Sequence, residues 1–339
     1  MEEKQFIPYR LSFLFRLYSL NIIMLPKFLK FSCKQNLNHS RIGLLLSNNT
    51  IIDPSKVNKK YKEPFENMYN LMDEWQKKDD NHIRSFIDEL LDQQTSNHKS
   101  INTFDLNEIK IHAPLRPRNN VICIGKNYSD HIAEVAAARG NDSNEITEAP
   151  KYPVIFTKSA DCVIGHDENI PNHSNITKWL DYEAELAVII GNNITNNNNQ
   201  KDAWNSIFGY TIGNDITARE LQKRHTQWWK GKSLNGGCPL GPVVIPASHL
   251  SPLEVQNLNI SCTVNGEIRQ NSNTSKMIFD IPTIISTLSQ GYTLHPGDTI
   301  LTGTPDGVGF AMKPPQSLAM NDVVSVQIEK IGTLTNQVV

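Results

Sequence analysis

The sequence lacks paired cysteines, an excess of charge of either sign and a long uninterrupted apolar run. Its five cysteines are scattered and include no C-x-x-C pair, which excludes a zinc knuckle or a redox couple built on that motif. Lysine and arginine number 33 against 35 aspartates and glutamates, so the net charge of −2 provides no field that attracts nucleic acid or anionic lipid. The composition therefore predicts reduced thiols in an intracellular compartment, and neither a nucleic acid nor a membrane as partner.

Acidic residues are also missing from the start of the chain. No aspartate or glutamate occurs between Glu3 and Asp53, although lysine and arginine do. The apolar run 11–25 is interrupted by Arg16 and is shorter than the roughly 18 to 20 residues that a membrane span needs. This bias is typical of mitochondrial presequences, so we predict that residues 1–40 are a leader for mitochondrial import. The alternative is a disordered extension of a cytoplasmic protein.

The remaining pattern predicts an α+β protein in two parts. Residues 41–46 and 50–53 read as two strands joined by a polar turn, and apolar spacing of three and four within 62–94 predicts two amphipathic helices. We assign residues 41–115 to a small α+β N-terminal domain. Short strands separated by glycine, proline and asparagine turns then predict a larger β-rich domain over residues 116–339.

The segment 180–191 carries closely spaced carboxylates. If it is one strand, alternation places Glu183 and Glu185 on the same face as Asp181, with neighbours about 7 Å apart. Like charges on a half-buried face need a cation or a proton, and Ala187 and Ile189 continue this face into apolar residues. A metal site is therefore favoured over a solvent-facing acidic stripe.

A third carboxylate, Asp215, ends the next predicted strand. It comes directly before a predicted helix, for which Thr217 and Glu220 have the spacing of a capping box. Three oxygen ligands on rigid elements suit Mg²⁺ or Mn²⁺, which leave room for water or substrate in their octahedral shells. Asp215 alone would read as an ordinary turn residue.

A histidine and a glutamate share one face of a predicted helix over 129–139. His131 and Glu134 are spaced i, i+3, so the carboxylate can orient the imidazole and raise its basicity, as a general base requires. A surface pair without function is the alternative. Two glycine-rich loops, 231–237 with Lys232 and 301–309, can direct backbone N–H groups at a carboxylate. Neither has the spacing of a nucleotide-binding P-loop.

Six motifs in this order resemble the fumarylacetoacetate hydrolase family, from about Arg41 to the C-terminus. They are the segments 123–131, 181–185, 213–219, 231–233, 238–242 and 301–309. The segments 227–232 and 313–315 are most similar to the branch called fumarylacetoacetate hydrolase domain-containing protein 2. The resemblance implies a β-rich catalytic domain of the mixed sandwich or roll type behind a small N-terminal domain, in a homodimer.

The resemblance also implies roles for single residues. It places Mg²⁺, with Mn²⁺ or Ca²⁺ as alternatives, on Glu183, Glu185 and Asp215. His131 and Glu134 correspond to a proton-transfer dyad on a lid, and Lys232 to a lysine facing the negative charge that develops on the substrate. Tyr128, Gln222 and Thr304 match positions that contact substrate oxygens in the family. The alternatives are that Tyr128 only packs under the lid, that Gln222 lies on a helix surface, and that Thr304 only stabilises its turn.

One departure bears on the substrate. True fumarylacetoacetate hydrolases carry an aspartate metal ligand where this chain has Lys126, which argues against fumarylacetoacetate itself. A small 2-oxo acid fits better, because a metal and Lys232 would stabilise its enolate while His131 moves a proton. The resemblance favours enol–keto tautomerisation of oxaloacetate. Hydrolysis of C–C bonds in acylpyruvate-type acids, decarboxylation and a non-catalytic metabolite-binding relative are the alternatives.

Overall fold

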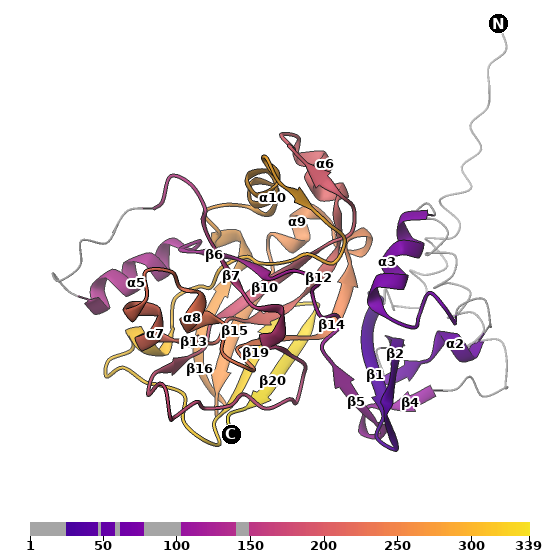
Figure 1. Cartoon of the computed structure of the whole chain (residues 1–339), viewed down its shortest axis with the longest axis horizontal. Helices are drawn as coiled ribbons and strands as arrows, with labels where there is room; N and C mark the ends of the chain where they lie inside the picture. The colour runs from indigo at the N-terminus through magenta and orange to yellow at the C-terminus, as the bar shows by residue number, and fades with distance from the viewer. Residues whose placement is uncertain (1–24, 47–48, 58–61, 78–102, 140–148) are drawn as a thin grey trace, which may run out of the picture.

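The computed structural model describes residues 25–46, 49–57, 62–77, 103–139 and 149–339 (Figure 1). A twelve-stranded sheet runs through both parts of the chain, with the order β4-β3-β2-β1-β14-β12-β10-β18-β6-β7 and with β5 and β8 beside it. Its N-terminal strands are β1 (Lys27–Cys33), β2 (Asn36–Leu45), β3 (Thr50–Ile52), β4 (Thr103–Asp105) and β5 (Ile109–His112). The others are β6 (Val121–Gly125), β7 (Val154–Lys158), β8 (Val163–Ile164), β10 (Ala184–Ile190), β12 (Ile207–Asn214), β14 (Cys238–Pro246) and β18 (Thr299–Leu301).

A second sheet packs on the centre of the first. It has four antiparallel strands in the order β16 (Glu267–Asn273), β15 (Asn259–Val264), β19 (Val323–Ile328) and β20 (Gly332–Gln337). Val188 of β10 shares a core with Ile260 and Val326 of this sheet, while Ala187 belongs to a separate cluster with Leu301. Apolar layers on both faces explain why β10 and β12 are buried along their whole length. The predicted β-rich α+β fold is confirmed.

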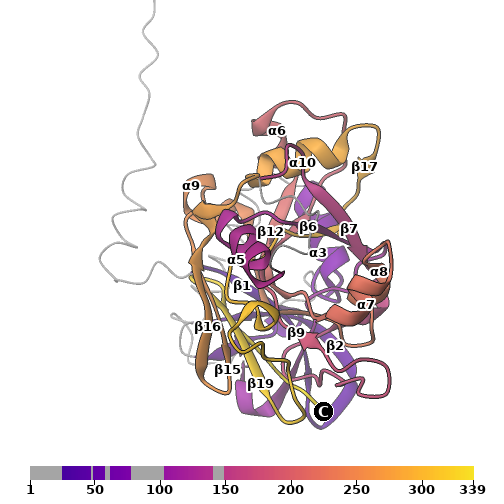
Figure 2. The same ribbon diagram turned by 90° about the vertical axis from the view of Figure 1, so that its left-hand side faces the viewer.

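Three helices lie together at one end of the large sheet. Figure 2 shows α5 (Ser129–Arg139) standing opposite α7 (Arg219–Arg224) and α8 (Trp229–Lys232). The predicted helix over 129–139 and the strand pair β2–β3 are confirmed, and α3 (Met68–Lys77) confirms one of the two N-terminal helices. The second of these, after residue 77, lies outside the described residues. No helix in the described parts of the chain is long and apolar enough to cross a membrane.

The predicted leader boundary at residue 40 is wrong. Residues 27–40 form β1 and the start of β2, and β1 pairs with β2, with β5 and, through Phe28 opposite Val244, with β14. Phe28, Leu29 and Phe31 are completely buried. Strand β1 thus joins the N-terminal strands to the rest of the sheet. Residues 1–24 lie outside the described residues, so import by that shorter segment stays a prediction.

Deletion of β1 is expected to prevent folding. Burial of each of its three large side chains contributes about 2 kcal/mol, so their combined loss is comparable with the whole stability of a typical domain. A chain starting at Pro26 should unfold cooperatively in urea, whereas one starting at Arg41 should be insoluble or show no cooperative transition. Equal transitions for the two chains would show that β1 is dispensable.

Candidate active site

Three buried carboxylates meet at the end of the large sheet where α5, α7 and α8 lie. Glu183 precedes β10, Glu185 lies within it, and Asp215 follows the neighbouring strand β12. Pairing of Glu185 with Gly213 sets the register of these strands, and the Asp215 amide donates to the Glu183 carbonyl oxygen at 2.9 Å. One ligand oxygen from each side chain lies within 4.8 Å of the others. The structure therefore brings the predicted triad together.

The local structure around the triad differs from the prediction. The segment 180–191 is not one strand, because β9 (Leu180–Asp181) ends before Glu183 and pairs with β13 (Thr217–Ala218). The carboxylate of Asp181 consequently turns away from the triad and accepts from the amides of Gly309 and Phe310 at 2.8 and 3.0 Å.

The capping box predicted after Asp215 is also wrong. Helix α7 begins at Arg219, and the Thr217 hydroxyl donates to the Asp215 carbonyl oxygen. Glu220 accepts from the Thr177 hydroxyl and the Lys178 amide instead of reaching back to Thr217. Thr217 pairs in β13, so it is not available as the N-cap residue. Asp215 is thus held at a strand corner rather than at a helix cap.

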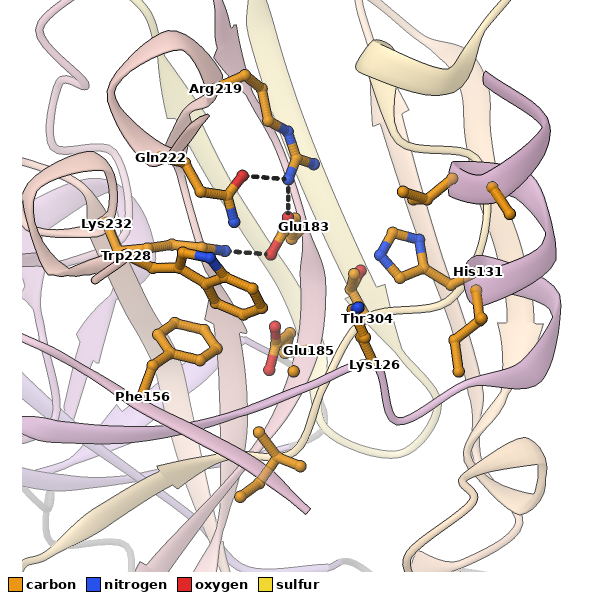
Figure 3. A pocket seen from close by; sticks show the side chains of 15 residues that line it. Lys126, His131, Phe156, Glu183, Glu185, Arg219, Gln222, Trp228, Lys232 and Thr304 are labelled. Atoms are coloured by element: carbon orange, nitrogen blue, oxygen red, sulfur yellow. Dashed lines mark hydrogen bonds and ion pairs between the residues drawn. The ribbon is translucent and has the colours of Figure 1, made fainter. Parts of the chain in front are cut away.

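Three cations surround the carboxylates. Lys232 Nζ lies 2.6 Å from Glu183 Oε2 and 2.7 Å from Asp215 Oδ2. Lys158 Nζ lies 2.6 Å from the other Asp215 oxygen, Oδ1, and donates to the Ile216 carbonyl oxygen at 3.0 Å. Arg219 Nη1 lies 2.7 Å from Glu183 Oε1, and its Nε donates to Asp181 at 2.9 Å. Figure 3 shows Arg219 and Lys232 converging on Glu183.

These contacts shift the pKa values of Glu183 and Glu185 in opposite directions. Burial acts to raise the pKa of Glu183, but Lys232 and Arg219 outweigh it and lower that pKa to about 2. Burial raises the pKa of Glu185 well above its usual range, and the negative charges of Asp215 and Glu183 raise it further. Glu185 accepts from the Gly303 amide at 2.6 Å. Additional positive charge beside Glu185 would therefore lower its pKa and favour its ionised form.

The donor set fits a hard divalent metal ion. All three groups offer carboxylate oxygens, which Mg²⁺, Mn²⁺ and Ca²⁺ prefer, and the raised pKa of Glu185 is what a shortage of positive charge produces. A dication there would compensate the repulsion among the carboxylates. Glu183, Glu185 and Asp215 can thus hold a metal ion.

A cleft opens beside the triad between α5 on one side and α7 and α8 on the other. Its polar lining includes the side chains of Lys126, His131, Glu183, Glu185, Arg219, Gln222, Lys232 and Thr304 (Figure 3). Ile132 and Val135 of α5 and the rings of Phe156 and Trp228 form much of its apolar wall. His131 projects from the wall opposite Lys232 and Gln222 (Figure 3). A small polar molecule in this cleft would lie among both carboxylates and cations.

The predicted His131 and Glu134 dyad is present on α5 but is loose. His131 Nδ1 lies 3.7 Å from Glu134 Oε2, which is beyond hydrogen-bond distance, and within the described residues this nitrogen has no hydrogen-bond partner. Both Glu134 oxygens accept from the Gly307 amide, at 2.9 and 3.0 Å. Glu134 therefore fastens α5 to the glycine-rich loop. His131 lines the cleft, with its buried Nδ1 on the side of Glu134.

The three predicted substrate contacts lie in different settings. Gln222 and Thr304 line the cleft, where Gln222 Oε1 accepts from Arg219 at 3.3 Å and Thr304 Oγ1 accepts from Gln270 at 2.8 Å. Tyr128 is 1% exposed and is not part of the lining. Burial raises the pKa of its hydroxyl, which has no hydrogen-bond partner in the described part of the chain. Its placement agrees with the alternative in which Tyr128 packs at the start of α5.

Comparison with known proteins identifies the family of the chain. Residues 120–339 match the family model described as fumarylacetoacetate (FAA) hydrolase C-terminal. The chain belongs to the fumarylacetoacetate hydrolase family. The family predicted from the six motifs is thereby confirmed, whereas the narrower assignment to the domain-containing protein 2 branch stays a prediction.

Individual relatives extend the likeness beyond the matched domain. The chain is 39% identical over 327 residues to Oxaloacetate tautomerase YisK of Bacillus subtilis (strain 168), covering 91% of this chain and 100% of that protein. Fumarylacetoacetate hydrolase (EaFAH) from Exiguobacterium antarcticum is 34% identical with a TM-score of 0.71, covering 92% of this chain and 99% of that chain. A 5-carboxymethyl-2-hydroxymuconate delta-isomerase from Mycobacterium smegmatis is 28% identical with a TM-score of 0.65, covering 92% and 98%.

The sequence analysis did not predict two cations at this site, Lys158 and Arg219. Lys158 is completely buried at the end of β7, and the side chain of Arg219, at the start of α7, is 13% exposed. A signal existed for Lys158, because a lysine that ends an apolar strand needs a buried counter-charge. Arg219 follows Asp215 by four residues, but only the pairing of β9 with β13 brings it to Asp181 and Glu183.

Replacing Lys158 by methionine is expected to lower the free energy of unfolding by about 3 to 5 kcal/mol. Removing one partner of a buried ion pair destabilises the charge that remains. Here Asp215 keeps Lys232 at Oδ2, but its buried Oδ1 loses its cation. Urea denaturation measures the loss. The control, Lys151→Met at an exposed position, should change stability by less than about 0.5 kcal/mol. A Lys158→Met loss below about 1 kcal/mol would contradict the pairing.

Proposed function

We propose that this protein is a metal-dependent enzyme that interconverts the enol and keto forms of a small 2-oxo acid, with oxaloacetate as its substrate. The observation that carries the proposal is a cleft holding the carboxylate triad, Lys232 and His131 together. The chain that forms it is 39% identical, over the full length of that protein, to one named Oxaloacetate tautomerase.

Glu183, Glu185 and Asp215 would hold the metal ion, which we propose to be Mg²⁺, with Mn²⁺ and Ca²⁺ as alternatives. When bound, the ion supplies Lewis-acid polarisation of the 2-oxo acid oxygens. Titration of the three ions into chelator-treated protein, followed by calorimetry and activity, compares them directly.

Protein groups supply the remaining chemistry. Lys232 lines the cleft beside the triad, where its ammonium group can stabilise negative charge on the enolate oxygen in addition to its contacts with Glu183 and Asp215. Gln222 and Arg219 present hydrogen-bond donors from α7 to the substrate carboxylate. Thr304 offers a hydroxyl from the glycine-rich loop on the other side of the cleft.

Proton transfer is assigned to His131. Ketonisation removes the proton from the C2 hydroxyl and adds one at C3, and the reverse reaction takes the C3 proton away. The imidazole faces the cleft from the wall opposite Lys232, so it can exchange a proton at C3 while Lys232 stabilises charge at the C2 oxygen (Figure 3). Glu134 acts through its bonds to the Gly307 amide, which hold α5 in place.

The test follows the absorbance of enol-oxaloacetate in the presence of Mg²⁺, while pyruvate and CO₂ are quantified in the same reaction. Protein-dependent loss of the enol without pyruvate supports the tautomerase. Stoichiometric pyruvate with CO₂ would instead indicate a decarboxylase. Without acceleration, acylpyruvates become the substrates to test, because the similar structure from Exiguobacterium antarcticum is named a hydrolase. No turnover of either class would favour a non-catalytic metabolite-binding relative.

Assembly and location are separate parts of the proposal. We infer a homodimer from the family resemblance, which light scattering of the purified chain tests. We infer mitochondrial import from residues 1–24, where Lys4, Arg10 and Arg16 alternate with apolar and hydroxyl residues and no acidic residue follows Glu3. A cytoplasmic protein is the alternative. Fusion of these residues to a fluorescent reporter distinguishes the two locations.

A further inference from the structure

Gln270 is a completely buried polar residue that lies outside the cleft. It belongs to β16 of the second sheet, where it pairs opposite Cys262 of β15, and it is not part of the cleft lining. Burying a carboxamide is costly unless its donors and its acceptor have hydrogen-bond partners. The partners of Gln270 therefore indicate why a polar residue is kept at this position.

Gln270 connects the start of β10 with the glycine-rich loop 301–309. Its Oε1 accepts from the Ala184 amide at 3.0 Å. Its Nε2 donates to Thr304 Oγ1 and to the Pro305 carbonyl oxygen, both at 2.8 Å. Ala184 lies between the two glutamates of the triad, and Thr304 lines the cleft. One side chain thus joins the segment that carries two of the proposed metal ligands to the loop that faces the substrate.

The orientation of the carboxamide follows from its partners. The Ala184 amide can only donate and the Pro305 carbonyl oxygen can only accept, so the Gln270 oxygen must face the first and the NH₂ group the second. Thr304 Oγ1 consequently receives a proton from Gln270. In the part of the chain that the structure describes, no protein group accepts the proton of the Thr304 hydroxyl itself. This proton is therefore free to serve a molecule in the cleft.

Thr304 is close to the triad. The residue before it, Gly303, donates its amide to Glu185 Oε2 at 2.6 Å, so the loop contacts one of the three carboxylates directly. In the view of Figure 3, Thr304 lies between Glu185 and His131, and all three line the cleft. The Thr304 hydroxyl is thus placed to donate to an oxygen of a molecule bound at the triad.

We propose that Gln270 is a positioning residue that acts through Thr304. By donating to Oγ1, it fixes the hydroxyl as a hydrogen-bond donor toward the cleft, where an oxygen anion of a 2-oxo acid or of its enolate accepts. This inference rests on the proposed function, since it assumes that the 2-oxo acid head binds at the triad. It explains why a residue that does not contact the substrate affects how the substrate is bound.

The test is a double-mutant cycle of Gln270→Glu and Thr304→Val, measured by calorimetric titration of oxalate into Mg²⁺-loaded protein. Oxalate resembles the planar enolate of a 2-oxo acid, and its binding needs no turnover. In Gln270→Glu, the oxygen that replaces Nε2 accepts the Thr304 proton and withdraws it from the cleft. Each single variant should bind oxalate about 10- to 100-fold more weakly, the effect of losing one hydrogen bond to a charged group. The double variant should bind it no more weakly than Thr304→Val.

Two controls exclude a purely structural effect. If Gln270 only supported the metal ligands, its replacement would weaken Mg²⁺ binding by about 10- to 100-fold, whereas we expect a change below about threefold. The reason is that Gln270→Glu keeps an acceptor for the Ala184 amide. Gln327→Glu, the same substitution at an exposed position of β19, should leave the oxalate affinity unchanged. If Gln270→Glu does not unfold cooperatively in urea, Gln270→Met, which buries no charge, takes its place in the cycle.

The outcomes separate this inference from the proposed reaction. Losses that multiply in the double variant, or wild-type oxalate affinity in Gln270→Glu, overturn the role of Gln270 even if enol loss is catalysed. A fall in Mg²⁺ affinity equal to the fall in oxalate affinity, or a wild type that does not bind oxalate, overturns it as well. The expected cycle without catalysed enol loss overturns the reaction and leaves the positioning role in place.

Discussion

Glu183→Gln is expected to lower kcat/KM for enol-oxaloacetate by about a thousandfold or more, which corresponds to about 4 kcal/mol of transition-state stabilisation. The substitution replaces a charged ligand oxygen of the triad with a neutral amide of the same shape. Affinity for Mg²⁺ should fall by more than about 100-fold, because even residues that only support a metal ligand cost 10- to 100-fold. Steady-state kinetics and Mg²⁺ calorimetry on the same preparation measure the two losses.

The fold of this variant should persist. Lys232 and Arg219 keep Asp215 and Asp181 as charged partners, so no buried cation is left without one. Circular dichroism and urea denaturation check this, and Glu267→Gln, on an exposed side chain of β16, is the matched control for activity. Undiminished activity in a folded Glu183→Gln protein would show that the triad does not hold the metal used in turnover.

His131→Ala is expected to lower kcat by about 10²- to 10⁴-fold, the range found when a general acid or base is removed. Mg²⁺ affinity should be retained, because His131 lies on α5, across the cleft from Lys232. It is not among the three residues that would bind the metal ion. That combination, slow turnover with normal metal binding, distinguishes the proton-transfer role from the metal role of Glu183.

The control for this variant is His39→Ala, which removes an exposed histidine of β2 in the N-terminal part of the sheet. It should have the kcat of the wild type. A near-native rate for His131→Ala would assign the proton transfer to another group and leave His131 as a residue of the cleft wall.

Local patterns predicted much of the site but not its electrostatic environment. Glu183, Glu185 and Asp215 were found because alternation and a strand end are local features, and they stay together although the strand breaks after Asp181. The partners Lys158 and Arg219 come from β7 and α7, and only the long-range pairing of the sheets brings them to the triad. Spacing in the sequence carries no information about such contacts.

The boundary of the N-terminal part shows the same limitation. Lys27, Lys30 and Lys34 give the segment the composition of a presequence, whereas Phe28 and Phe31 between them face the core. The decisive fact is that Phe28 pairs opposite Val244, more than 200 residues away in the sequence. Compositional bias therefore predicted a leader where the structure has a strand that joins the two parts of the sheet.

The most direct test of the central claim is the metal dependence of enol loss. The rate of enol-oxaloacetate disappearance is measured with the purified full chain, after removal of metal by chelation, and after addition of Mg²⁺. A metal-dependent tautomerase should accelerate enol loss with Mg²⁺ and return to the uncatalysed rate after chelation. Adding Mg²⁺ should restore the rate of the wild type but not that of Glu183→Gln. A rate that equals the uncatalysed one in every condition, or that is independent of metal, would contradict the central claim.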